Sequence, residues 1–208
     1  MSRYATGVET VACSETRGLP RRGLLGGALG GAAVLGGASF LARAAGVFAA
    51  ASGGQDTRIF NLVLRLEYTE AAFYAEALRN GTLRGELREY ARTAGDHEQQ
   101  HVQFLRQALG AKAVPRPHFD FGNATRDPDA FTRTAIKLED LAVAGYNGQA
   151  TNLSRAALGA AATIVSVEAR HAAWIRAIAG QVAAPDPVDK PATAAEVEQG
   201  LKQIGMRA

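Results

Sequence analysis

The residues best suited to chemistry in this sequence are two Glu-x-x-His steps and two lone glutamates, one upstream of each step. On an α-helix, a residue and its i+3 neighbour lie on one face, so each step points a carboxylate and an imidazole in the same direction. Four carboxylates and two imidazoles suit a pair of iron or manganese ions. The predicted ligands are Glu67, Glu98, His101, Glu139, Glu168 and His171.

The same six residues have a second interpretation, a buried hydrogen-bonded network that holds no metal. In that network the four carboxylates would repel one another unless they were protonated or each had several partners. Two divalent ions would instead balance the charge of all four. We therefore expect two iron ions as the cofactor, with manganese or a mixed pair as the alternative.

Four long helices are expected to position these residues, because no stretch alternates like a strand. Glycines at positions 81, 110 and 180 supply stop signals. Asp127 and Pro128 form a favourable N-cap and N1 pair for the third helix. The first helix is expected to run from Asp56 or Thr57, as its N-cap, to Arg79. The other three are expected at residues 82–109, 127 to about 150, and about 153–179.

The lengths of the connections predict an all-α four-helix bundle of two antiparallel hairpins. The first and second helices, and the third and fourth, are joined by a few residues, whereas about 16 residues separate the second from the third. The long connection must cross the bundle, and its segment Phe119-Asp120-Phe121 is expected to pack against the helices. Counting residues from the helix ends puts all four carboxylates at one level.

The chain is expected to divide into an export signal at residues 1–51, the bundle at 52–183 and a tail at 184–208. The signal is of the twin-arginine type: Arg21 and Arg22 precede a weakly apolar run of Gly and Ala, with small residues for cleavage at 42–44 or 49–51. No Ser or Thr lies directly before Arg21 and no Lys directly after Leu25, so an uncleaved membrane anchor is the alternative. A short helix from Thr193 is predicted by a capping box with Glu196.

Charge and cysteine content exclude several classes of function. The net charge of +3 belongs to the leader, because removing residues 1–51 leaves 18 basic and 18 acidic residues. A neutral domain without a basic run gives no reason to expect nucleic-acid binding. Cys13, the single cysteine, also lies in the leader, so the remainder has no thiol chemistry.

Four stretches of the sequence together resemble a known family: residues 66–74 (LEYTEAAFY), 119–121 (FDF), 138–140 (LED) and 167–171 (VEARH). Through them the chain resembles the ferritin-like superfamily over roughly residues 56–180, and more closely its bacterial group related to desiccation-associated proteins. The resemblance implies that the six predicted ligands bind a di-iron or related dinuclear centre. It does not imply one activity, since the superfamily includes ferroxidases, oxygen and peroxide reductases, manganese catalases and members of unknown activity.

Three residues at helical spacing from the lone glutamates are candidates for the surroundings of the site. Glu70 is three residues after Glu67 and is predicted as a seventh ligand, an outer base or an iron relay, with a surface salt bridge as the alternative. Tyr74 and Tyr146 lie seven residues after the two lone glutamates. Their phenols are placed to hydrogen-bond a ligand or carry electrons, and ordinary core packing is the alternative.

Asp140 and Asp96 are further candidates, since a metal-bound imidazole usually donates its second N–H to a carboxylate or carbonyl. A solvated position is the alternative for both. His97 is about 100° around the helix from its neighbour Glu98 and is expected to miss the metals. His118 is expected to be an ordinary loop histidine, and Trp174 to cap the apolar layer below the site.

These observations predict an exported, periplasmic or extracellular, ferritin-like protein that binds a dinuclear centre. Ferroxidase or peroxide-related stress protection is the expected role, with dioxygen or peroxide as the reactant. The alternative is a non-catalytic envelope or desiccation-stress protein that uses the bundle as a structural or interaction module. Turnover by the metal-loaded protein separates the two. A membrane partner is expected only if the signal is uncleaved, and homo-oligomers are left open.

Overall fold

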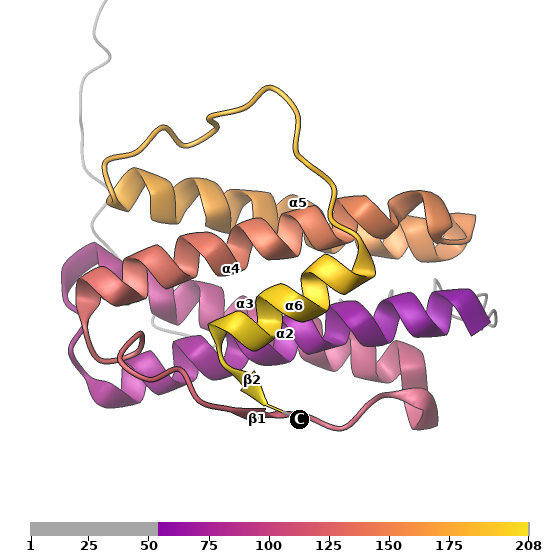
Figure 1. Cartoon of the computed structure of the whole chain (residues 1–208), viewed down its shortest axis with the longest axis horizontal. Coiled ribbons are helices and arrows are strands. Elements are labelled where there is room, and N and C mark those ends of the chain that lie inside the picture. Colours follow the sequence, from indigo (N-terminus) through magenta and orange to yellow (C-terminus); the bar gives the residue numbers. More distant parts are fainter. Residues whose placement is uncertain (1–53, 208) are drawn as a thin grey trace, which may run out of the picture. The chain divides into compact units, whose positions relative to one another are not determined.

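The computed structural model describes residues 54–207, and most of this part of the chain is helical (Figure 1). The twin-arginine signal, its anchor alternative and Cys13 lie outside the described residues. Within that range, no helix is both long and apolar enough to cross a membrane. The α-helices are α2 (Gly54–Asn80), α3 (Gly85–Leu109), α4 (Pro128–Gln149), α5 (Arg155–Ile178) and α6 (Ala194–Ile204).

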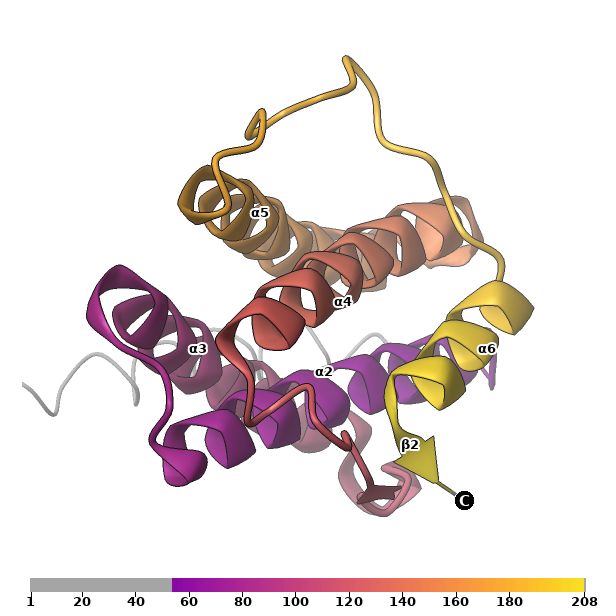
Figure 2. The same cartoon turned by 60° about the vertical axis from the view of Figure 1, so that its left-hand side comes forward.

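The four long helices form the predicted bundle of two hairpins joined by a crossover (Figure 2). Helix α2 packs mainly against α3, and α4 mainly against α5, because the loops within each pair are short. The pairs meet where α2 packs on α4 and α3 packs on α5. Each helix therefore has two neighbours and turns one face to a shared interior. Two short 3-10 helices, Gly110–Lys112 and Ala150–Asn152, extend α3 and α4.

Side-chain caps begin α4 and α5, and one predicted cap has a different partner. The Asp127 carboxylate accepts a hydrogen bond from the Ala130 N–H at 2.7 Å, as the sequence predicts. Asp56, expected as a candidate N-cap of the first helix, instead lies inside its first turn. Its buried carboxylate accepts hydrogen bonds from the N–H and hydroxyl of Ser154, the N-cap of α5, at 2.9 and 2.7 Å. Asp56 thus ties α2 to α5.

The crossover packs on the bundle through the predicted Phe119-Asp120-Phe121 segment. Phe121 is buried, and its ring meets that of Phe73 edge-on at 5.3 Å. Phe73 also stacks on Phe131 at the start of α4, with ring centroids 5.0 Å apart. The aromatic contacts therefore join both hairpins and the connection between them.

The tail forms the predicted helix α6, whose capping box is complete between Thr193 and Glu196. Val197 and Leu201 are fully buried where α6 packs on α2 and α4. Beyond α6 the structure contains a strand pair that the sequence did not predict. Strand β2 (Met206–Arg207) pairs antiparallel with β1 (His118–Phe119) in the crossover. The residues after α6 therefore hydrogen-bond the crossover.

Candidate metal centre

The six predicted ligands meet inside the bundle as two overlapping groups of four. The ligand atoms within each group lie within 4.8 Å of one another. Glu98 and Glu168 belong to both groups, and these are the carboxylates of the two Glu-x-x-His steps. The two groups therefore share these residues, whereas Glu67 and Glu139 each belong to one group and are termed the terminal glutamates. The groups are Glu67, Glu98, His101 and Glu168, and Glu98, Glu139, Glu168 and His171.

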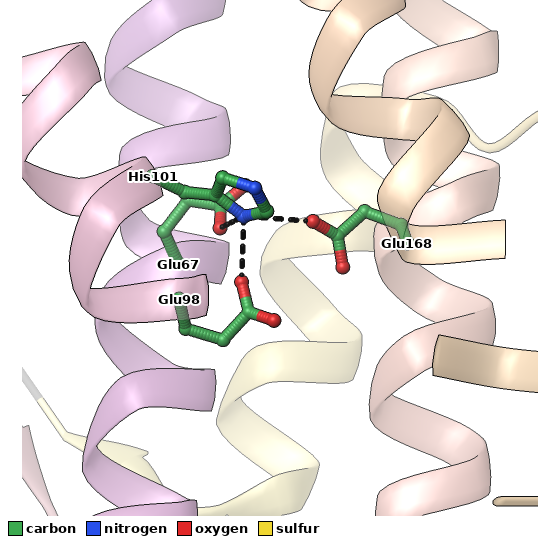
Figure 3. Close-up of side chains that lie close together, drawn as sticks. All are labelled: Glu67, Glu98, His101 and Glu168. Atoms are coloured by element: carbon green, nitrogen blue, oxygen red, sulfur yellow. Dashed lines mark hydrogen bonds and ion pairs between the residues drawn. The ribbon is translucent and has the colours of Figure 1, made fainter. Parts of the chain in front are cut away.

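The first group converges on the imidazole of His101, as Figure 3 shows. The Nδ1 atom of His101 lies 2.8 Å from Glu98 Oε2, 3.0 Å from Glu168 Oε1 and 3.2 Å from Glu67 Oε2. These carboxylates come from three different helices. A cation at this point would therefore have ligands from α2, α3 and α5.

The second group has a similar arrangement around His171. Its Nδ1 atom lies 2.9 Å from Glu98 Oε1 and 3.5 Å from oxygens of Glu139 and Glu168. Helix α4 contributes Glu139 to this group, as α2 contributes Glu67 to the first group. The two histidines therefore present the same nitrogen to the shared pair of carboxylates, one to each group.

Several of these buried atoms have no hydrogen bond, although they lie close together. The short distances around His171 lack hydrogen-bond geometry, which leaves its Nδ1 without a partner. Buried polar atoms are almost always paired, so a cluster of unpaired ligand atoms fits a site completed by cations. The unpaired atoms of the two groups are Glu98 Oε1, Glu139 Oε2, both oxygens of Glu168 and His171 Nδ1.

Close carboxylates favour the protonated form of both imidazoles. Burial alone would lower the pKa of both imidazoles, but the surrounding carboxylates outweigh it. The charge of Glu67 and hydrogen bonds with its neighbours raise the pKa of His101 far above its usual value. The close carboxylates of Glu139, Glu168 and Glu98 raise the pKa of His171 to about 12.

The pKa values of the carboxyl groups shift in opposite directions. Burial and repulsion from Glu168 raise the pKa of Glu67 well above its usual value, and burial raises that of Glu139 to about 7. Burial would also raise the pKa of Glu98, but the hydrogen bond with His101 and the charge of the nearby His171 imidazole lower it instead. Binding of cations must therefore displace protons from several residues of the centre.

Tyrosines hold the outer oxygens of the two terminal glutamates. The Tyr146 hydroxyl donates to Glu67 Oε1 at 2.5 Å. The hydroxyls of Tyr74 and Tyr90 both donate to Glu139 Oε1, the second at 2.9 Å. In each of these glutamates, Oε1 accepts the tyrosine hydrogen bonds. The other oxygen, Oε2, faces a histidine: His101 for Glu67 and His171 for Glu139.

The family model for the ferritin-like domain matches residues 55–181, which is more than half of the chain. The chain belongs to the ferritin-like domain family. The matched residues include the six ligands and all but the first residue of the four-helix bundle. The chain has no significant match among curated proteins.

The ferritin-like domain buries Glu70 completely, which excludes a surface salt bridge. The Asp140 carboxylate accepts hydrogen bonds from an arginine, Arg176, at 2.5 and 2.6 Å. Within the described residues, no hydrogen bond or ion pair joins Asp140 to a predicted ligand. Asp96 is exposed on α3, and His118 is exposed in β1. Neither of these two belongs to the predicted ligand groups of the ferritin-like domain.

Two contacts of this ferritin-like domain were not found from the sequence. His97 lies outside both ligand groups, as expected, but its Nδ1 is 2.9 Å from Nε2 of His171 and the two rings stack. His97 therefore contacts Nε2 of His171, whereas the carboxylates lie near Nδ1 of the same ring. Tyr90 is fully buried two turns before Glu98 on α3, a spacing that could have suggested its contact with the centre. Trp174 packs edge-on against Tyr90, with ring centroids 5.3 Å apart.

Proposed function

We propose that this protein is an exported ferritin-like oxidoreductase that binds two metal ions, iron in the first place and manganese or a mixed pair as the alternative. Its reactant is dioxygen or peroxide, and its role is ferroxidase or peroxide-related stress protection. The observation that carries the proposal is the pair of ligand groups that share Glu98 and Glu168. Shared carboxylates suit two ions held close together rather than one.

The chain's own residues would hold and shield such a centre. His101 and His171 would each bind one ion, the shared glutamates would bind both, and Glu67 and Glu139 would each complete one side. When bound, the metals supply the one-electron chemistry that side chains lack. The tyrosines fix the terminal carboxylates, and burial of all six ligands limits access of water to them.

A pocket between α3 and α5 supports reaction with a small molecule. Its volume is about 430 Å³, and its lining includes both ligand histidines together with His97. Gln100 and Arg170 also line it and are exposed, so solvent reaches the pocket. A small oxidant could approach the centre by this route without unfolding of the bundle.

Export rests on the sequence of residues 1–51, and we propose a periplasmic or extracellular location on that basis. The twin-arginine pathway carries folded proteins, which suits a protein that must load its metal before it meets competing ions. Kinship with the desiccation-associated group is proposed from the same stretches that carry the resemblance. Processing of the leader is tested by determining the N-terminus of the protein recovered from cell envelopes. An N-terminus at Met1 or Ser2 in all recovered protein would contradict cleavage.

The test of function is elemental mass spectrometry of the full chain, purified without chelator, followed by Fe(II) oxidation on the same sample. We expect about two metal ions per chain and repeated oxidation under dioxygen or peroxide. A Glu98→Gln, His101→Ala double variant should lose two-metal loading, since it removes ligands from both groups. Two ions without turnover would favour the structural module, and no metal after anaerobic reconstitution would exclude a metal centre.

A further inference from the structure

Glu70 is a fifth carboxylate within the interior that holds the predicted centre, and neither ligand group includes it. Its side chain is 0% exposed, and neither carboxylate oxygen has a hydrogen-bond partner. Within the described residues no Lys, Arg or His forms an ion pair with it. An isolated buried carboxylate is costly, so its presence at this position requires a physical reason.

The surroundings of Glu70 are the carboxylates of the centre. Burial raises its pKa well above the usual value, and the charges that add to this effect are those of Glu168, Glu98 and Glu139. The nearby hydroxyls of Tyr74 and Tyr146 are already donated to the terminal glutamates. Glu70 therefore adds negative charge to a crowded acidic interior and receives no hydrogen bond in return.

Protonation alone does not explain this arrangement. A neutral carboxyl group would no longer repel its neighbours, but it would still carry an O–H donor and a carbonyl acceptor, and both would be buried without partners. A cation satisfies the oxygens directly. The unpaired atoms of Glu70 thus have the same character as those of Glu168 and Glu139.

The position is also asymmetric between the two halves of the bundle. Glu67 and Tyr74 on α2 correspond in spacing to Glu139 and Tyr146 on α4. The residue three after Glu139 is Ala142, which is fully buried without any polar group. The equivalent position on α4 is therefore packed by an apolar side chain, and only α2 has a carboxylate there, that of Glu70.

We propose that Glu70 is a fifth carboxylate ligand of the centre, one that makes the two metal positions chemically inequivalent. This inference rests on the proposed dinuclear function. It assigns the centre seven protein ligands, five of them carboxylates, which suits hard cations such as Mn(II), Fe(II) or Fe(III). One ion then has a fuller oxygen shell than the other and exchanges ligands less readily.

The test compares Glu70→Gln with wild type in Mn(II) titration calorimetry and in the visible spectrum of the Co(II)-loaded full chain. We expect the variant to bind one of the two ions at least tenfold more weakly, because the amide is a poorer ligand. The Co(II) bands should change, since they report the coordination of the ion. Without metal, the variant should melt close to wild type, because an amide of nearly the same size replaces a carboxyl group that has no hydrogen-bond partner.

Glu76→Gln is the matched control, because Glu76 lies on the same helix and accepts a hydrogen bond from Thr125 at 2.6 Å. It should bind both ions as wild type does. If Glu70→Gln does not fold, Glu70→Asp is used in its place. The aspartate keeps the negative charge, but its shorter side chain moves the carboxylate away from the metals. Glu70→Asp should therefore weaken binding of the same ion.

The outcomes separate this proposal from the proposed function. Wild-type protein that takes up fewer than two ions contradicts the dinuclear centre itself, whatever Glu70 does. Wild-type uptake of two ions, with unchanged Mn(II) affinities and Co(II) spectrum in the folded Glu70 variant, overturns only the assignment of Glu70.

Discussion

At the scale of single residues, the two terminal glutamates are held by tyrosines that cross between the hairpins. Tyr74 is on α2 but donates to Glu139 on α4, whereas Tyr146 is on α4 and donates to Glu67 on α2. Each phenol thus orients a carboxylate contributed by the other hairpin. Groups that orient ligands in this way commonly change metal affinity 10- to 100-fold when they are removed.

Substitution Tyr146→Phe should therefore weaken metal binding about tenfold or more. The ring remains to fill the core, but Glu67 loses its hydrogen bond and becomes free to rotate. Titration with Mn(II) measures the change. Tyr68→Phe is the control, because its buried hydroxyl reaches only the Val114 carbonyl at 3.5 Å. Equal affinities in Tyr146→Phe and wild type would mean that the hydrogen bond does not orient the ligand.

His97 should act on the metals only through His171. Replacement His97→Ala removes both the stacked ring and the hydrogen bond to Nε2 of His171, so we expect about tenfold weaker binding of one ion. His97→Asn places an amide near the position of Nδ1 and should restore part of the affinity. The same Mn(II) titration is used, with the exposed His118→Ala as the control. Failure of the asparagine to improve on alanine would contradict a role through hydrogen bonding.

The convergence of the six residues could be predicted because the i, i+3 spacing fixes the common direction of each Glu-x-x-His pair on its helix, and residue counts from the helix ends put the two lone glutamates at the same level. The surroundings could not be predicted in the same way. The contact of His97 with His171 depends on how α3 and α5 are rotated against each other, and the contact of Tyr90 with Glu139 joins residues 49 positions apart. Asp140 shows the same limit, because its partner Arg176 is 36 residues away on another helix.

At the scale of elements, the bundle depends on a close approach between α4 and the tail that leads into α6. A Cβ atom on Gly148 would lie 1.8 Å from the carbonyl oxygen of Ala192. Backbone contacts join the same segments, since the Ala192 N–H donates to the Ala144 carbonyl at 2.9 Å. Only glycine leaves room for the tail at this point of α4.

Gly148→Ala should therefore destabilise the protein by about 1 to 3 kcal/mol, the usual cost of overpacking. Gly159→Ala is the matched control on α5, where a Cβ meets nothing within 4 Å. That change should stabilise by about 0.5 to 1 kcal/mol, because alanine favours the helix. Denaturant unfolding of both variants without metal measures the difference. Similar stabilities would show that the tail moves aside at little cost.

The four long helices and the short one were predictable, because each has local signals. Asp127, Ser154 and Thr193 cap their helices with their own side chains, which are contacts within three residues. The pairing of β1 with β2 lacks any such signal. It joins two residues of the crossover to two near the end of the chain, and its register follows from where α6 docks. Asp56 likewise caps a helix 98 residues away.

At the scale of the whole molecule, we expect the proposed centre to make the stability of the fold depend on both pH and metal. In the metal-free protein the pKa values of His101, His171, Glu67, Glu70 and Glu139 are all raised. Above about pH 5 the folded chain therefore binds more protons than the unfolded chain. Stability must then fall as pH rises, with the loss continuing through neutral pH. The raised pKa of Glu139, about 7, lies within this range.

Bound metal should reverse this trend, because cations displace the same protons and bind more tightly as pH rises. We expect the melting temperature of the metal-free full chain to fall between pH 5.5 and 8.5. The gain on adding Mn(II) should grow over the same range, with about 2.7 kcal/mol for each ion present at 100 times its dissociation constant. Thermal unfolding with and without Mn(II) measures both curves. A gain that stays constant with pH would mean that the ions bind outside this protonated cluster, because displacement of its protons is what couples metal binding to pH.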